Sequence, residues 1–396
     1  MVGTFDFEKE YGLVLEGGGA KGAYQIGVWK ALKECNVKIK GIAGVSVGAL
    51  NGALICMNDL ELAEKIWNNI TYSQVMDVDD EDMKNLMQHD IKNIKLKRLT
   101  ITSAKAVTSG GFDISPLKNL IDVYLDEKKI RECPMELIMG TLSLKDLKEI
   151  EIVAKELAEG EIKNFLIASA SLPLFKQEKL QGKTYLDGGM VNNVPIDMLL
   201  KRDYKDIIVV RIFGIGVERK VKIPEGVKIL EIAPRVELGN ILEFDPHKAQ
   251  RNIRIGYFDA MRVLKNLKGK IYYIDSMASE AEYFQKLCNL NAAVQMAFLE
   301  YFKESYEDGN LYLRKMVEIV FPAIAEKLGL PKNWTYSQLY LSMLELSAKA
   351  LKVQKYRVYT EEAFCSEIRQ NYMKYGEPEK KVDLFIQLIV KAMAID

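Results

Sequence analysis

The stretch that decides the fold is Ile42-Ala43-Gly44-Val45-Ser46-Val47-Gly48-Ala49-Leu50. An apolar, β-prone run ends at Val45 and a helix-prone run begins at Val47, so this stretch predicts a sharp strand-to-helix turn. Gly44 and Gly48 complete the G-x-S-x-G pattern of a nucleophile elbow. Such a turn would present Ser46 at a helix N-terminus, where the helix dipole favours developing negative charge. Taken alone, the pattern fits a nucleophile and an ordinary glycine-rich turn about equally well.

A second glycine-rich loop lies upstream, between a predicted buried strand at residues 11–15 and a predicted amphipathic helix at residues 23–33. Its sequence is Glu16-Gly17-Gly18-Gly19-Ala20-Lys21-Gly22. The spacing matches the G-x-G-x-x-G turn of dinucleotide-binding folds, but that interpretation requires an acidic residue where the second strand of this chain ends in Ser46. A Walker A loop is excluded, because no Gly-Lys-Ser/Thr follows the glycines.

The remaining interpretation of the upstream loop is an oxyanion hole. Backbone N–H groups at a helix start can bind an anion, and two neighbouring strand-to-helix turns of a parallel sheet would bring this loop beside Ser46. We therefore expect Gly17, Gly18 and Gly19 to stabilise an oxyanion next to the nucleophile, which is an arrangement for acyl transfer.

With these motifs, the chain resembles the patatin-like phospholipases. Three motifs occur in the family's order, namely Gly17-Gly18-Gly19-Ala20-Lys21-Gly22, Gly44-Val45-Ser46-Val47-Gly48 and Asp187-Gly188-Gly189. Lys21 occupies the family's Arg/Lys position, and residues 111–117 and 168–175 are also similar to family segments. The resemblance covers residues 11–275 and implies a three-layer α/β/α sandwich with a mainly parallel sheet. It also implies a bacterial lipid acyl hydrolase of the phospholipase A type, with Ser46 as nucleophile and Asp187 as proton acceptor.

The histidine content favours a Ser-Asp dyad over a Ser-His-Asp triad, because the chain has only His89 and His247. His247 lies at the polar start of a predicted helix, and His89 lies in a segment of mixed charge. The elbow also follows the second strand, whereas α/β hydrolases need several strands before theirs. We therefore expect Asp187 to take the proton of Ser46 as an acyl-enzyme forms, with no metal and no cofactor.

Two segments near these motifs each allow two interpretations. Residues 71–109 are polar, with a predicted helix at residues 81–97, and are either a lid over the site or a solvated insertion. The apolar loop at residues 172–175 either lines an acyl pocket or packs in the core.

The hydrophobic pattern predicts a catalytic domain at residues 1–275 and an all-helical domain at residues 276–396. Further strands are expected at residues 134–144, 149–155, 184–186, 206–213, 228–234 and 270–275. Further helices are expected at residues 59–69, 161–169, 245–267, 287–306, 312–328, 336–351 and 382–394. Several large apolar side chains of the second domain are expected in its core, although a partner or membrane surface stays open: Met296, Phe298, Phe302, Met343 and Phe385.

The composition is that of a soluble globular protein, with 48% apolar and 28% charged residues among 396. Equal numbers of basic and acidic residues, 55 of each, give no charge argument for a nucleic-acid partner. Five scattered cysteines, the absence of a signal peptide and the lack of a long apolar run predict a cytoplasmic protein whose membrane contact would be peripheral. The oligomeric state stays open. The alternatives in function are a carboxylesterase or thioesterase, and a catalytically idle interaction scaffold.

Overall fold

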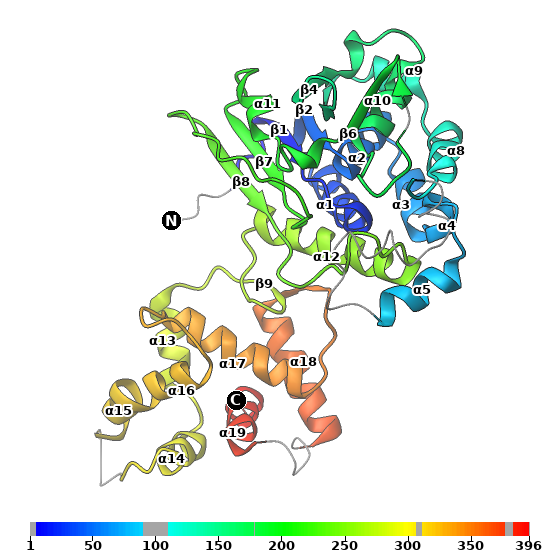
Figure 1. Ribbon diagram of the computed structural model, residues 1–396. Helices are drawn as coiled ribbons and strands as arrows, with labels where there is room; N and C mark the ends of the chain where they lie inside the picture. The colour runs from blue at the N-terminus through cyan, green and yellow to red at the C-terminus, as the bar shows by residue number, and fades with distance from the viewer. Residues whose placement is uncertain (1–4, 90–109, 178, 306–310, 377–382, 396) are drawn as a thin grey trace. The chain divides into compact units, whose positions relative to one another are not determined.

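The computed structural model describes residues 5–89, 110–177, 179–305, 311–376 and 383–395. They form two compact units, an N-terminal unit at residues 5–263 and a C-terminal unit at residues 264–396 (Figure 1). The domain division after residue 275 stays a prediction. Part of the predicted helix at residues 81–97 is observed, as α5 (Asp80–His89), whereas residues 90–109 lie outside the described residues, so the lid interpretation stays open.

The N-terminal unit is built on one mainly parallel sheet with the strand order β5-β6-β3-β2-β1-β7-β8, to which β4 adds beside β3. Its strands are β1 (Glu10–Leu15), β2 (Lys38–Val45), β3 (Glu136–Ser143), β4 (Lys148–Val153), β5 (Lys179–Leu180), β6 (Lys183–Asp187), β7 (Asp206–Val210) and β8 (Lys228–Ile232). The neighbouring strands β3, β2, β1, β7 and β8 pair in parallel. β4 and β6 pair antiparallel with β3, and β5 pairs antiparallel with β6. The expected α/β fold with a mainly parallel sheet is confirmed.

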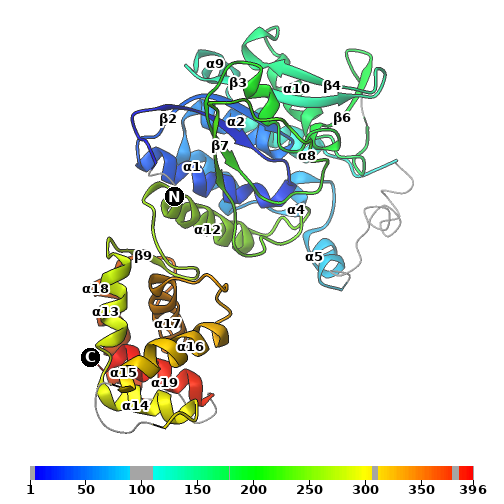
Figure 2. The same ribbon diagram turned by 90° about the vertical axis from the view of Figure 1, so that its left-hand side faces the viewer.

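Helices cover both faces of this sheet, which agrees with the continuous buried runs at residues 11–15 of β1 and 41–45 of β2. Gly44 of β2 faces α2, whereas Ala43 and Val45 pack with Met198 and Leu199 of α11 on the other face. Figure 2 shows α1 beside α12 below the sheet. The helices of the unit are α1 (Ala23–Glu34), α2 (Val47–Met57), α3 (Leu60–Asn68), α4 (Tyr72–Val75), α5, α8 (Ser115–Tyr124), α9 (Glu127–Glu132), α10 (Glu161–Ser169), α11 (Ile196–Leu200) and α12 (Pro246–Leu264).

The described part of the C-terminal unit is helical apart from one short pair of parallel strands, β9 (Tyr273–Asp275) and β10 (Val358–Thr360). Its helices are α13 (Glu280–Cys288), α14 (Ala292–Tyr301), α15 (Leu311–Lys315), a π-helical turn (Met316–Val320), α16 (Phe321–Lys327), α17 (Tyr336–Ala350), α18 (Glu361–Tyr375) and α19 (Leu384–Ala394). The expected helical region is confirmed. The strand predicted at residues 270–275 belongs to this unit, where it pairs with β10, and the sequence missed β10, α13 and α18.

The core of the C-terminal unit contains most of the side chains that the sequence placed there. Phe298, Met343 and Phe385 are buried in one apolar cluster, and Phe302 packs against it. Met296 is the exception, because it is exposed. Four of these five side chains therefore contribute to the core, as expected.

Candidate active site

Ser46 lies at the apex of the turn that joins β2 to α2, and its backbone adopts φ 55° and ψ −131°. A non-glycine residue in this region is strained by about 1–3 kcal/mol and needs support from its surroundings. The Ser46 N–H donates to Ser169 Oγ at 3.0 Å, and that hydroxyl donates in turn to the carbonyl oxygen of Gly140 at 2.6 Å. A β-carbon at Gly44 would lie 2.5 Å from the Gly48 carbonyl, so only glycine fits there. The predicted elbow is present.

Asp187 is the last residue of β6 and is buried. Its Oδ1 accepts the N–H of Gly189 at 2.8 Å, whereas the buried Oδ2 has no hydrogen-bond partner among the described residues. Burial raises the pKa of this carboxyl to about 6, and the Ser46 hydroxyl and the Gly189 N–H lower it in part. The Ser46 hydroxyl is therefore close enough to act on the carboxyl, although no hydrogen bond of ordinary geometry joins the two side chains.

The glycine loop between β1 and α1 lies against Ser46, because a β-carbon at Gly17 would be 3.2 Å from the Ser46 Cβ. The Gly17 N–H already donates to the Asn193 carbonyl oxygen at 3.2 Å. The N–H groups of Gly18 and Gly19 have no hydrogen-bond partner in the described part of the chain. Two of the three expected oxyanion donors are thus available to a ligand, and the third holds the loop in place.

Sequence reasoning missed the side chains that support this loop. Glu16, buried directly before the glycines, accepts the N–H groups of residues 212, 213 and 214 at 2.6, 3.0 and 3.1 Å. It also pairs with Arg211 at 3.1 Å. Asn193 donates from its Nδ2 to the Gly17 carbonyl oxygen at 3.1 Å. In the sequence, the acidic residue directly before the glycines was the available signal of this support, but its partners lie almost 200 residues further along the chain.

An apolar pocket of about 770 Å³, including its opening to solvent, adjoins Ser46. Most of its lining side chains are aliphatic or aromatic and come from α2, α3, α8 and nearby loops: Leu50, Leu54, Ile66, Trp67, Ile70, Leu117, Leu120, Ile121, Tyr124 and Phe244 among them. Leu172 and Phe175 also line it. The loop at residues 172–175 therefore contributes to this pocket, and its Leu174 and Phe175 are also buried in the core. That the pocket holds an acyl chain stays a prediction.

His247 does not form a triad with Ser46 and Asp187 in the described structure. His247 is the second residue of α12, and its exposed side chain forms no hydrogen bond with a described residue. The side chain of His89 lies outside what the structure describes. Among the described residues, Ser46 and Asp187 have no histidine partner.

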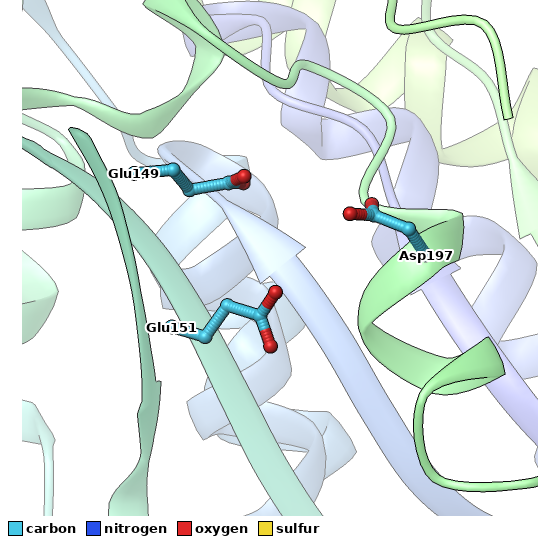
Figure 3. A group of neighbouring side chains, drawn as sticks. All are labelled: Glu149, Glu151 and Asp197. Atoms are coloured by element: carbon cyan, nitrogen blue, oxygen red, sulfur yellow. The ribbon is translucent and has the colours of Figure 1, made fainter.

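One group of carboxylates has the spacing of a metal site but is already paired with cations. Figure 3 shows Glu149 and Glu151, from β4, pointing toward Asp197 at the start of α11. Arg219 lies 2.8 Å from Glu149 and 3.3 Å from Asp197, and Lys201 pairs with Glu151 and Asp197. Arg202 also lies 3.5 Å from Glu151, so three cations balance the three carboxylates and the cluster is interpreted as a structural network.

Two solved structures align along most of the chain at low similarity. The alignment with VipD from Legionella pneumophila covers 97% of this chain and 84% of the VipD chain, with 13% identity and a TM-score of 0.41. The alignment with the type III effector protein ExoU covers 97% of this chain and 77% of the ExoU chain, with 15% identity and a TM-score of 0.34.

Two curated relatives match parts of the chain. Patatin-like phospholipase domain-containing protein 7 of Rattus norvegicus is 27% identical over 208 residues, which are 50% of this chain and 13% of that protein. Neuropathy target esterase sws of Drosophila persimilis is 58% identical over 45 residues, or 11% of this chain and 3% of that protein. The chain thus spans a small part of the length of these relatives. The family model "Patatin-like phospholipase" matches residues 13–200, which contain Ser46, Asp187 and the glycine loop, and this part of the chain belongs to that family.

Proposed function

We propose that the N-terminal unit is a serine hydrolase that cleaves fatty-acyl esters of lipids, in the manner of a phospholipase A. The observation that carries this proposal is the position of Ser46, at a strained elbow between an apolar pocket and the buried Asp187 carboxyl, whose Oδ2 has no partner among the described residues. Membership of residues 13–200 in the patatin-like phospholipase family supports the same reaction.

In the acylation step, Ser46 Oγ attacks the ester carbonyl carbon while its proton passes to Asp187 Oδ2. A pKa of about 6 leaves most of the carboxyl groups ionised at neutral pH, yet makes them stronger bases than an ordinary aspartate. The N–H groups of Gly18 and Gly19 stabilise the oxyanion of the tetrahedral intermediate. Gly17 has a different role, because its N–H is bonded to Asn193 and its missing side chain lets the loop approach Ser46.

The intermediate then collapses and the bond between the carbonyl carbon and the leaving alcohol breaks. The alcohol oxygen takes the proton from Asp187, which returns to its ionised form, and the acyl group stays on Ser46. Water attacks this acyl-enzyme while Asp187 again accepts a proton, and Ser46 leaves with that proton as the fatty acid is released. These steps use only groups of the chain, so we propose no metal and no cofactor.

The substrate class follows from the pocket. Its aliphatic and aromatic lining favours an acyl chain, whose burial is driven by the hydrophobic effect, and leaves the polar part of the substrate outside. A carboxylesterase or thioesterase would use the same dyad on a shorter or differently activated acyl group, so a profile of rate against acyl chain length separates these activities. All five cysteines are free, which supports a cytoplasmic location as part of this proposal.

A fluorophosphonate probe tests the nucleophile directly. The wild-type protein should become covalently labelled, and Ser46→Ala should not, because the probe reacts only with an activated serine. Labelling that persists in a folded Ser46→Ala protein would contradict the assignment of Ser46. Absence of labelling in the wild type would instead favour the idle scaffold.

Asp187→Asn is the matched test of the base, since it removes the proton acceptor with little change in side-chain size. Turnover of a lipid ester should fall by several orders of magnitude while the circular dichroism spectrum is retained. A variant with near wild-type kcat would exclude Asp187 as the base.

A further inference from the structure

The segment Phe213-Gly214-Ile215-Gly216-Val217, which follows β7, packs against both loops of the candidate site. A β-carbon at Gly214 would overlap the Gly17 carbonyl oxygen, and one at Gly216 would lie 2.6 Å from the Gly189 carbonyl oxygen. The Val217 N–H donates to the Gly189 carbonyl at 2.8 Å, and the Val217 carbonyl accepts the Asn193 N–H at 2.7 Å. The two glycines therefore face the glycine loop and the turn that follows Asp187.

The apolar residues that alternate with these glycines are turned to solvent. The side chains of Phe213, Ile215 and Val217 are 51%, 65% and 51% exposed. The segment is an irregular loop, in which Phe213 adopts φ 47° and residues 215–216 form a bend. Met190, three residues after Asp187, and Val236, which follows β8, are also exposed. Contiguous exposed apolar side chains at one place on a surface indicate an interaction site.

The same segment continues into exposed basic residues. Lys220 and Lys222 form no ion pair with any residue that the structure describes, whereas Arg219 is anchored by Glu149 at 2.8 Å. Ile223, beside Lys222, is partly exposed as well. Apolar side chains next to free ammonium groups complement a lipid surface that carries negative charge. Among the described residues no helix is both long and apolar enough to cross a bilayer, so such contact would be made by this segment from outside.

We propose that residues 213–223 dock the N-terminal unit on an anionic lipid surface. Ile215 and its apolar neighbours enter the head-group layer, and Lys220 and Lys222 contact lipid phosphates. This inference rests on the proposed function, because a lipid held at this surface lies beside the glycine loop and the turn that follows Asp187. A lipid surface with negative charge accounts for both the exposed apolar side chains and the adjacent cations, which a purely apolar protein partner would not.

The test measures vesicle binding separately from catalysis. Full-length Ser46→Ala protein, which binds without hydrolysis, is sedimented with phosphatidylcholine vesicles and with vesicles containing about one quarter phosphatidylglycerol. Ile215→Asn combined with Ile223→Asn should weaken binding about tenfold or more on the anionic vesicles. Lys220→Gln combined with Lys222→Gln should abolish most of the preference for anionic vesicles, because each ammonium near such a surface strengthens binding several-fold. Val123→Asn, at a 73% exposed position of α8, is the matched control and should bind normally.

Hydrolysis assays on proteins that keep Ser46 then separate the proposed docking from the proposed function. The Ile215→Asn, Ile223→Asn protein should cleave a soluble short-chain ester as the wild type does and lose most of its activity on vesicles. If no ester is cleaved by any protein, the proposed function fails, while the sedimentation results still decide the docking. Docking is overturned if vesicle binding is unchanged in both double variants, or if Val123→Asn weakens it equally. Docking on lipid is likewise overturned if the double variants still bind vesicles but no longer bind a protein partner.

Discussion

Ser46 keeps an unfavourable backbone conformation because its neighbours leave it no alternative. Its N–H is held by Ser169, whose own hydroxyl is held by Gly140, and the glycines on either side allow the strand and helix to meet closely. The strain is thus offset by packing and hydrogen bonds around the elbow. A rigid elbow keeps the nucleophile in place before substrate binds, which lowers the entropic cost of reaching the transition state.

The raised pKa of Asp187 leads to a prediction on pH dependence. The base must be ionised to accept a proton, so kcat/KM should rise about tenfold per pH unit below a pKa of about 6 and level off above it. The measurement is the hydrolysis of a soluble ester between about pH 4.5 and 8.5. A profile that is already flat at about pH 5 would contradict the raised pKa.

Stability gives an independent check on the same group. Because the pKa of Asp187 is raised in the folded protein, its contribution to the free energy of unfolding is fully present below the unfolded-state pKa and is lost as pH rises through about 6. Asp187→Asn removes the ionised form, so its Tm should exceed that of the wild type at alkaline pH. This difference should shrink under acidic conditions.

At the residue scale, the sequence predicted the reacting groups better than their supports. Ser46 and Asp187 were found because the elbow and the Asp-Gly-Gly turn are local patterns. Ser169, Glu16 and Asn193 were missed, since their bonds join residues separated by 123 and 177 positions. For the same reason the sequence could not show that the N–H of Gly17 is already engaged.

At the scale of elements, prediction succeeded where the periodic apolar pattern extended over many residues and failed where it extended over few. The strand end expected at Val45 and the helix start expected at Val47 agree with the last residue of β2 and the first residue of α2. β10 has only three residues, too few to carry a period of two. α18 was missed because its surface is largely polar, with few buried residues such as Phe364 and Ile368.

The crossing of α1 and α12 allows a prediction at this scale. A β-carbon at Gly256 would overlap the Tyr24 carbonyl oxygen, and one at Gly27 would overlap the Ile253 carbonyl oxygen, so the two helix backbones are in contact. Gly256→Ala should therefore lower the free energy of unfolding by about 1–3 kcal/mol, although alanine is the better helix former. Chemical denaturation measures this change. His247→Ala, at an exposed position of the same helix, is the control, and an equally stable Gly256→Ala protein would contradict the close crossing.

At the scale of the whole molecule, the candidate chemistry is confined to the N-terminal unit. The described residues of the C-terminal unit form their own apolar core, with Phe298, Phe321 and Phe364 buried in it. The family match, residues 13–200, ends well before this unit begins. The all-helical character of the second unit was predictable from its period of 3.6, whereas its short strand pair depends on contacts between residues 85 positions apart.

The whole chain also offers an unusually simple test of the dyad, because it contains only two histidines. In a triad, the histidine acts as base and acid in every turnover, and its removal costs several orders of magnitude in rate. His247 is exposed and has no hydrogen bond to a described residue, so we expect the double variant His89→Gln, His247→Gln to keep most of its kcat/KM on a lipid ester. Circular dichroism confirms that the variant is folded. If His247→Gln alone removes activity from a folded protein, the base is a histidine, and Asp187 takes the supporting role that an aspartate has in a Ser-His-Asp triad.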